Sequence, residues 1–107
     1  TPAPAVVSFP AGSTALTPAA RRVVQNQVTS LLRARVTTVT VAAVVTLPRN
    51  ASTAWRNQVI AAARARAEGV ARVAAAQVRT MGSKAKVVTR VVTTTAENVR
   101  QVKISGK

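Results

Sequence analysis

An uncharged run of mostly β-branched residues constrains the fold more than any other feature of the chain. Residues 36–46, VTTVTVAAVVT, carry no charged side chain, and Leu47-Pro48 ends the run. Val and Thr favour strands because their branched side chains pack well on a pleated surface. The length of the run and its lack of charge are typical of a central strand covered on both faces. We therefore expect a buried strand at residues 36–46, with the rest of the fold arranged around it.

The segment before this run has the pattern of a helix. Thr17 is a suitable N-cap, and Pro18 suits the first helical position, where a missing N–H costs nothing. Apolar residues then recur at helical spacing, at Ala20, Val24, Val28 and Leu31. The pattern predicts a helix over residues 18–34.

A second helix is predicted after the run, from its cap at Ser52 to Thr80, before Met81-Gly82. Gly69 interrupts the apolar stripe and costs about 1 kcal/mol relative to Ala in a helix interior. A kink or break near Gly69 is therefore the alternative to one continuous helix. Trp55 falls in the apolar stripe, and we expect Trp55 and Phe9, the only two aromatic residues, to anchor the core; the alternative is that they form a binding platform.

Three shorter β-branched segments complete the predicted fold, at residues 6–9, 84–92 and 99–105. The last two are separated by a segment short enough for a hairpin, residues 93–98. The resulting order is β-α-β-α-β-β, an α+β fold (an α/β sandwich). Its crossovers should place two helices on one face of a mixed four-stranded sheet. We expect a single domain at residues 6–105, after an extended lead-in at residues 1–5.

The charge balance limits the partners that this chain can have. Lys and Arg total 16, the only acids are Glu68 and Glu97, and the net charge is +14. Such a chain attracts anions at long range: nucleic acid, anionic wall polymers, anionic lipid surfaces or acidic patches on another subunit. The alternative is that Arg serves only to solvate the surface. The bases are spread along the whole chain, which argues against a sequence-specific nucleic-acid reader and leaves non-specific binding open.

The missing residue types argue against an enzyme that works through its own side chains. The chain has no His, Cys or Asp, so it lacks the usual general base and the thiol nucleophile. Glu68 and Glu97 both have the pattern of solvated surface residues, and two scattered carboxylates cannot hold a metal ion. We expect no catalytic residue, no metal and no cofactor.

No apolar run reaches the ~18–20 residues that a membrane-spanning helix needs. The opening residues, Thr1-Pro-Ala-Pro4, lack a basic segment followed by an apolar one, so we expect no signal peptide here. A mature secreted chain would have the same appearance. The expected location is outside the cell or in the cell envelope.

The order of elements and three local motifs resemble the OmpA-like C-terminal domain, a β-α-β-α-β-β module that binds peptidoglycan. Residues 9–16, FPAGSTAL, are similar to that family's F-x-x-G-S-x-x-L. Residues 57–65, NQVIAAARA, resemble its helix motif N-x-x-L-S-x-x-R-A. Residues 98–104, NVRQVKI, resemble its closing strand N-R-R-V-x-I. The resemblance spans residues 6–104 and implies a peptidoglycan-binding fold.

The resemblance also implies a ligand site, from which one residue is missing. The family grips the carboxylate and amide of a diaminopimelate residue with an Asp after the central strand and an Arg on the next helix. The matching region here, Val44-Val45-Thr46-Leu47-Pro48-Arg49, contains no acid. The Arg can be Arg64 or Arg66, since both fit part of the motif. With Asn57 and Arg100, these are the expected ligand-binding residues, beside the end of the central strand.

Three functions remain open. The first is a non-catalytic cell-envelope domain that contacts the wall through peptidoglycan or another anionic polymer. The second is a structural module of an assembly, such as a virion, filament or surface layer, that kept the fold and lost the pocket. Such a module would have protein partners or form a homo-oligomer. The third is a non-specific nucleic-acid binder.

Overall fold

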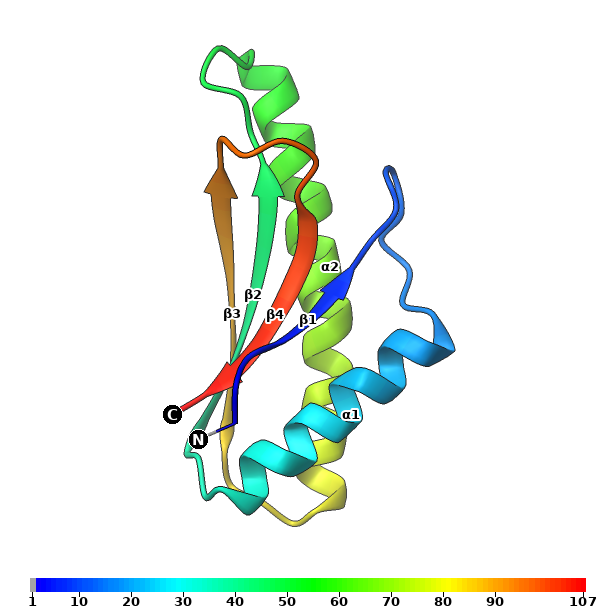
Figure 1. Ribbon diagram of the computed structural model, residues 1–107, viewed down its shortest axis with the longest axis vertical. Coiled ribbons are helices and arrows are strands. Elements are labelled where there is room, and N and C mark those ends of the chain that lie inside the picture. The colour runs from blue at the N-terminus through cyan, green and yellow to red at the C-terminus, as the bar shows by residue number, and fades with distance from the viewer. Residues whose placement is uncertain (1) are drawn as a thin grey trace.

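A computed structural model describes residues 2–107 (Figure 1). Its elements are β1 (Ala5–Ser8), α1 (Pro18–Arg33), β2 (Thr38–Thr46), α2 (Thr53–Thr80), β3 (Lys86–Thr94) and β4 (Arg100–Gly106). The strands form one mixed four-stranded sheet in the order β1-β4-β2-β3, and the two helices pack on one of its faces. The predicted α+β fold and its β-α-β-α-β-β order are confirmed.

The pairing of the last two strands differs from the prediction. β4 pairs antiparallel with both β1 and β2, whereas β3 pairs in parallel with β2 at the edge of the sheet. The predicted hairpin at residues 93–98 is therefore wrong, because β2 lies between β3 and β4. Burial explains the order: Val102 and Ile104 of β4 are fully buried, while no residue of β3 is. β4 thus fits the interior of the sheet and β3 fits its edge.

β2 is covered on one face only, which corrects the expectation of two covered faces. Along the strand, buried and half-buried residues alternate strictly. The buried positions face the helices, at Val39, Val41, Ala43 and Val45. The other face carries Thr38, Thr40, Ala42, Val44 and Thr46. The signal for this arrangement is the Thr/Val alternation at the start of the strand, because side chains of a strand point to opposite faces in turn.

Both helices begin at the predicted caps. The Thr17 hydroxyl accepts a hydrogen bond from the Ala20 N–H at 3.1 Å, and the Ser52 hydroxyl accepts one from the Trp55 N–H at 3.1 Å. α1 buries Val24, Val28 and Leu31 completely. The first helix and its cap are thus where the sequence predicts them.

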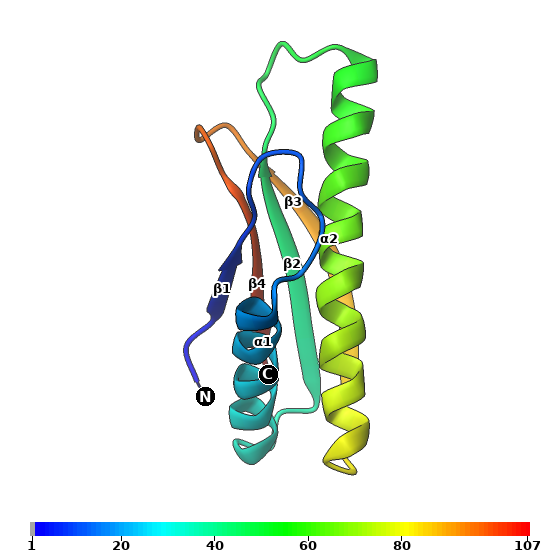
Figure 2. The same ribbon diagram turned by 90° about the vertical axis from the view of Figure 1, so that its right-hand side faces the viewer.

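α2 is one continuous helix through Gly69, so the alternative of a break there is wrong. Its buried residues lie on both sides of that glycine, at Ala63, Arg66, Ala67, Val70, Ala74 and Val78. This unbroken contact with the sheet keeps the helix intact across one poor helix former. At 1.5 Å per residue α2 is about 42 Å long, close to the 44 Å longest dimension of the molecule. Figure 2 shows it running beside the whole sheet and beyond the ends of the strands.

The two aromatic residues have different environments. Phe9 is 5% exposed and belongs to the core, as predicted, but Trp55 is 52% exposed. The prediction that Trp55 anchors the core is wrong. The first turns of α2 project past the ends of the strands (Figures 1 and 2), so no sheet lies opposite them to cover Trp55.

A side chain of α1 binds the backbone just before β1. The Gln27 side-chain amide donates hydrogen bonds to the Ala3 carbonyl at 2.9 Å and to the Ile104 carbonyl of β4 at 3.0 Å. Ala5 already belongs to β1. The predicted lead-in at residues 1–5 includes Thr1, which lies outside the described residues. Across residues 2–107, neither helix has an apolar stretch long enough to cross a membrane.

Candidate functional site

A cavity of about 340 Å³ lies at the end of the molecule where β2 stops. We call it the arginine pocket, and its lining residues are Val45, Thr46, Pro48, Trp55, Gln58, Val59, Ala62, Arg66, Asn98, Val99 and Arg100. They come from the end of β2 and the loop after it, from the first half of α2, and from the start of β4 with the two residues before it. The parallel strands β2 and β3 both end on this side (Figure 1). Sheets of α/β proteins commonly bind ligands outside the carboxyl ends of their strands.

The segment between β3 and β4 forms one wall of this pocket and is held by Thr46. The Thr46 hydroxyl donates a hydrogen bond to the Ala96 carbonyl at 2.6 Å and accepts one from the Val99 N–H at 2.8 Å. The Thr46 N–H donates to the Val99 carbonyl at 3.0 Å. Asn98 has a left-handed backbone, with φ of 57°, which turns the chain into β4. These bonds fix the position from which Arg100 enters the pocket.

Arg66 projects from α2 and is 4% exposed. Its Nε–H donates a hydrogen bond to the Ser13 carbonyl at 2.8 Å, and its guanidinium carbon lies 5.7 Å from the centre of the Phe9 ring. This separation is within the range of a cation–π interaction. Arg66 therefore fastens the loop after β1 to α2 and also lines the pocket.

Arg100 reaches the same pocket from β4. It is paired in register with Val45, which is buried on the helix-facing side of the sheet, so Arg100 points to that side as well. Its Nε–H is buried and has no hydrogen-bond partner among residues 2–107. Leaving a buried donor unpaired costs about 1–3 kcal/mol, and more for a charged group. The site thus holds a cationic donor whose hydrogen-bonding capacity is unused.

The surroundings of Arg66 disfavour its positive charge. Burial lowers the pKa of Arg66, and the nearby positive charge of Arg100 lowers it further. Arginine nevertheless remains protonated in proteins, so both charges persist. None of the residues that line the pocket is acidic, and Glu68 and Glu97 are both exposed, as predicted. A carboxylate or phosphate would relieve this repulsion and can accept paired hydrogen bonds from a guanidinium.

The structure brings together two of the four residues expected to bind ligand. Arg66 and Arg100 share the pocket, whereas Asn57 and Arg64 are exposed and line a separate depression on α2 together with Glu68. Arg64 precedes Arg66 by two residues, which is about 200° around the helix. The two arginines that fit the motif therefore point in different directions, and only Arg66 reaches the end of β2.

Sequence reasoning missed Trp55 as a residue of this site. Trp55 precedes Arg66 by about three helical turns, so the two side chains lie on one face of α2. That spacing was visible in the sequence. The exposure of Trp55, however, depends on the first turns of α2 projecting past the ends of the strands, and the sequence does not show this.

The fold and the pocket define a small α/β domain with a cavity built around two arginines. Comparison with protein-family models found no match, and comparison with curated proteins found none either. Within residues 2–107, no group of three or more His, Cys, Asp or Glu side chains is placed to hold a metal ion.

Proposed function

We propose that this domain is a non-catalytic module of the cell envelope. It contacts the cell wall by binding an anionic group of peptidoglycan, or of a polymer attached to it, in the arginine pocket. One observation carries the proposal. Arg66 of α2 and Arg100 of β4 converge on one cavity that has no acidic lining residue. The Nε–H of Arg100 is buried without a partner among the described residues, and a carboxylate or phosphate bound in the pocket would supply the counter-charge that both arginines lack there.

The resemblance to the OmpA-like domain supports this assignment. It implies a ligand site beside the end of the central strand, and the arginine pocket lies at the end of β2. The family's Asp is absent, and a second arginine, Arg100, lines the cavity instead. A site with two cations and no acid favours a purely anionic group over a zwitterion. The proposed ligand group is therefore a carboxylate or phosphate without an adjacent ammonium.

The net charge of +14 supports approach to an anionic wall but would not by itself give specificity. Attraction between exposed charges is screened by salt, with a Debye length of about 10 Å at 0.1 M and about 3 Å at 1 M. Interactions of partly buried groups are screened less. Raising the salt concentration should therefore weaken attraction by the surface charge more than it weakens binding in the pocket.

The test is retention of the purified domain on isolated peptidoglycan sacculi at low salt and at about 0.5 M NaCl. Arg100→Gln and Arg64→Gln form a matched pair, since each removes one positive charge but only Arg100 lines the pocket. We expect the wild type and Arg64→Gln to stay bound at high salt. Loss of a charged hydrogen bond should weaken Arg100→Gln about tenfold or more. Arg66→Lys, which keeps the charge and loses the bond to Ser13, should also weaken binding.

Circular dichroism and thermal unfolding of each variant show whether it is folded, which matters most for Arg66. Equal retention of the Arg100→Gln and Arg64→Gln variants would contradict the proposal. Loss of all retention at high salt would also contradict it, and would indicate attraction by net charge alone.

A structural role in an assembly is the second candidate, favoured by the open face of the sheet. Both helices lie on the other face, and Val6 and Val88 are 46% and 42% exposed. Val6 is in register with Lys103 and Val88 with Thr40, whose neighbours in sequence are buried, which places both on the open face. Concentration-dependent assembly in sedimentation, together with no retention on sacculi, would favour this role over the first.

A further inference from the structure

Trp55 is the feature of the arginine pocket that an anion alone does not explain. It is the only tryptophan of the chain. It is 52% exposed, although large aromatic side chains are normally well covered, and it lines the pocket that contains both arginines. Tryptophan is common at binding sites because its ring offers a large, rigid face for contact. The location of this exposed ring therefore points to a ligand.

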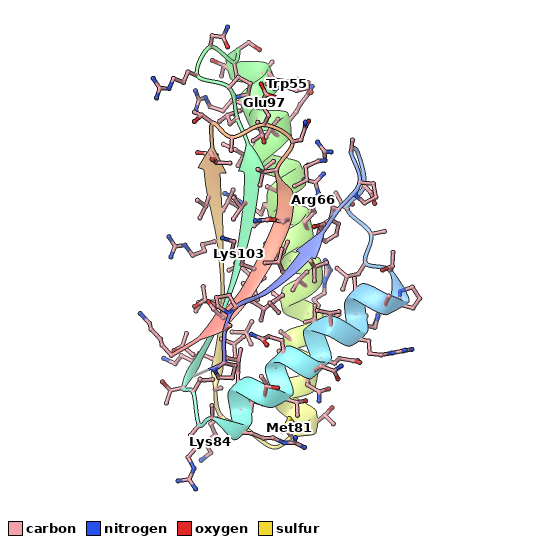
Figure 3. All side chains as sticks on the ribbon, in the orientation of Figure 1. Trp55, Arg66, Met81, Lys84, Glu97 and Lys103 are labelled. Carbon is pink, nitrogen blue, oxygen red and sulfur yellow. The ribbon has the colours of Figure 1, made fainter. Side chains whose placement is uncertain are left out.

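The pocket has two chemically different ends. Trp55 and Arg66 are separated by about three turns, or roughly 16 Å along α2. Figure 3 shows Trp55 near the start of the helix and Arg66 well along it. The rest of the lining includes apolar residues, Val59 and Ala62 from the helix and Val45 and Val99 from the sheet side. A ligand that fills the pocket would place an anionic group at one end and a flat, weakly polar surface at the other.

We propose that Trp55 is a second subsite of the pocket, where its indole ring stacks against a sugar ring of an acidic glycan. Arg66 and Arg100 hold a carboxylate or phosphate carried by the same molecule. One face of a pyranose ring presents C–H groups, which pack against an aromatic face while the ring hydroxyls remain in water. This inference rests on the proposed function and names its ligand class, a sugar with an attached anionic group.

A single-stranded nucleic acid also combines rings with phosphates, but the pocket does not favour it. Proteins that bind single strands stack successive bases on several aromatic side chains along a positively charged groove. Here Trp55 is the only exposed aromatic residue of the described chain, and it lies about three helical turns before Arg66. One ring contact at a distance from one anion contact fits a substituted sugar better.

Tryptophan fluorescence of the intact domain tests this directly. The chain has one Trp and no Tyr, so the emission reports on Trp55 alone. Three probes separate the two ends: a disaccharide-peptide released from peptidoglycan, neutral chitotetraose (fully N-acetylated), and the dipeptide N-acetyl-D-Ala-D-Ala, whose only charge is its carboxylate. We expect saturable emission changes with the disaccharide-peptide. The dipeptide, which has a carboxylate and no sugar, should bind more weakly and leave the emission unchanged. Chitotetraose, which lacks the anion, should bind weakly but change the emission.

Calorimetry on variants completes the test. Trp55→Ala should bind the disaccharide-peptide about tenfold more weakly and the dipeptide as the wild type does, whereas Arg100→Gln should weaken both. Met81→Ala is the matched control. Met81 is a large apolar residue, 39% exposed, beyond the far end of α2 (Figure 3), and its loss should change neither affinity.

The source of the anion is resolved with one more probe, a sugar-substituted poly(glycerol phosphate) oligomer. Tighter binding of this oligomer than of the disaccharide-peptide would assign the site to phosphate polymers of the wall, and the reverse order to peptidoglycan. Unchanged affinity of Trp55→Ala for both would overturn the inference, and the result with Arg100→Gln on sacculi would still stand by itself. An equal emission change with hexathymidylate would overturn it in favour of nucleic acid.

Discussion

Arg66 shows how one residue can serve both the fold and the site. Its Nε–H holds the Ser13 carbonyl and its guanidinium lies near Phe9, so it fixes the loop after β1. Its lowered pKa indicates that the positive charge is kept at a cost, since burial and Arg100 both oppose it. A planar guanidinium can hold the carbonyl and still present other N–H groups to a ligand, which a lysine ammonium does less well.

The ends of the two helices offer a prediction at the scale of single residues. After α2, Gly82 has φ of 67°, and the Ser83 N–H donates to the Val78 carbonyl at 3.1 Å. After α1, Arg35 occupies the same kind of position with φ of 63°. A left-handed backbone costs a residue with a side chain roughly 1–2 kcal/mol, which glycine avoids. We expect Arg35→Gly to raise the free energy of unfolding by about 0.5–1 kcal/mol and Gly82→Ala to lower it by about 1 kcal/mol.

Urea unfolding of both variants measures these free energies. The two substitutions are opposite changes at equivalent positions, so each is the control for the other. Changes of the same sign in both variants would contradict the explanation from backbone conformation.

At the scale of the helix, Gly69 lowers the helix propensity of α2 without breaking the helix. A methyl group added there would meet no atom within 4 Å, and the residue does not need a positive φ. We expect Gly69→Ala to stabilise the protein by about 1 kcal/mol, because Ala is the better helix former. For a domain of this size, that corresponds to a rise of about 4–8 °C in Tm.

Gly106→Ala is the comparison for this thermal unfolding experiment. A methyl group at Gly106 would lie 3.1 Å from side-chain atoms of Leu31 and Val36, so crowding should cancel any gain. A rise in Tm for Gly106→Ala as large as that for Gly69→Ala would show that chain entropy, rather than helix propensity, determines the effect.

The strands show that local sequence patterns predict where strands form but not how the strands pair. The Val-rich run correctly predicts β2, and the β-branched segments correctly predict three further strands. The prediction of a hairpin between β3 and β4 is wrong because strand pairing depends on which strand can be buried in the centre of the sheet. β4 has two fully buried residues and β3 has none, and this difference places β4 between β1 and β2.

For the whole molecule, the net charge of +14 should oppose the compact state. With 16 basic residues and only two acids, repulsion between the surface charges outweighs their attraction, and added salt screens that repulsion. We expect Tm to rise as NaCl is increased from about 20 mM to about 500 mM, with most of the rise complete once the Debye length is near 4 Å. Scanning calorimetry over this series measures the effect. A Tm that falls with salt would show that attractive charge pairs outweigh the repulsion.

The sequence by itself determined the helices, their caps and the existence of four strands. These features depend on the identity and spacing of residues close together in the chain, such as Thr17 before Pro18. It also named Arg66 and Arg100 as candidates, but grouped them with Asn57 and Arg64, which lie elsewhere. Only the tertiary structure decided the strand order, the exposure of Trp55 and the meeting of Arg66 with Arg100. Each of these depends on segments distant in the chain packing together, and that packing follows from how the whole molecule buries its apolar faces.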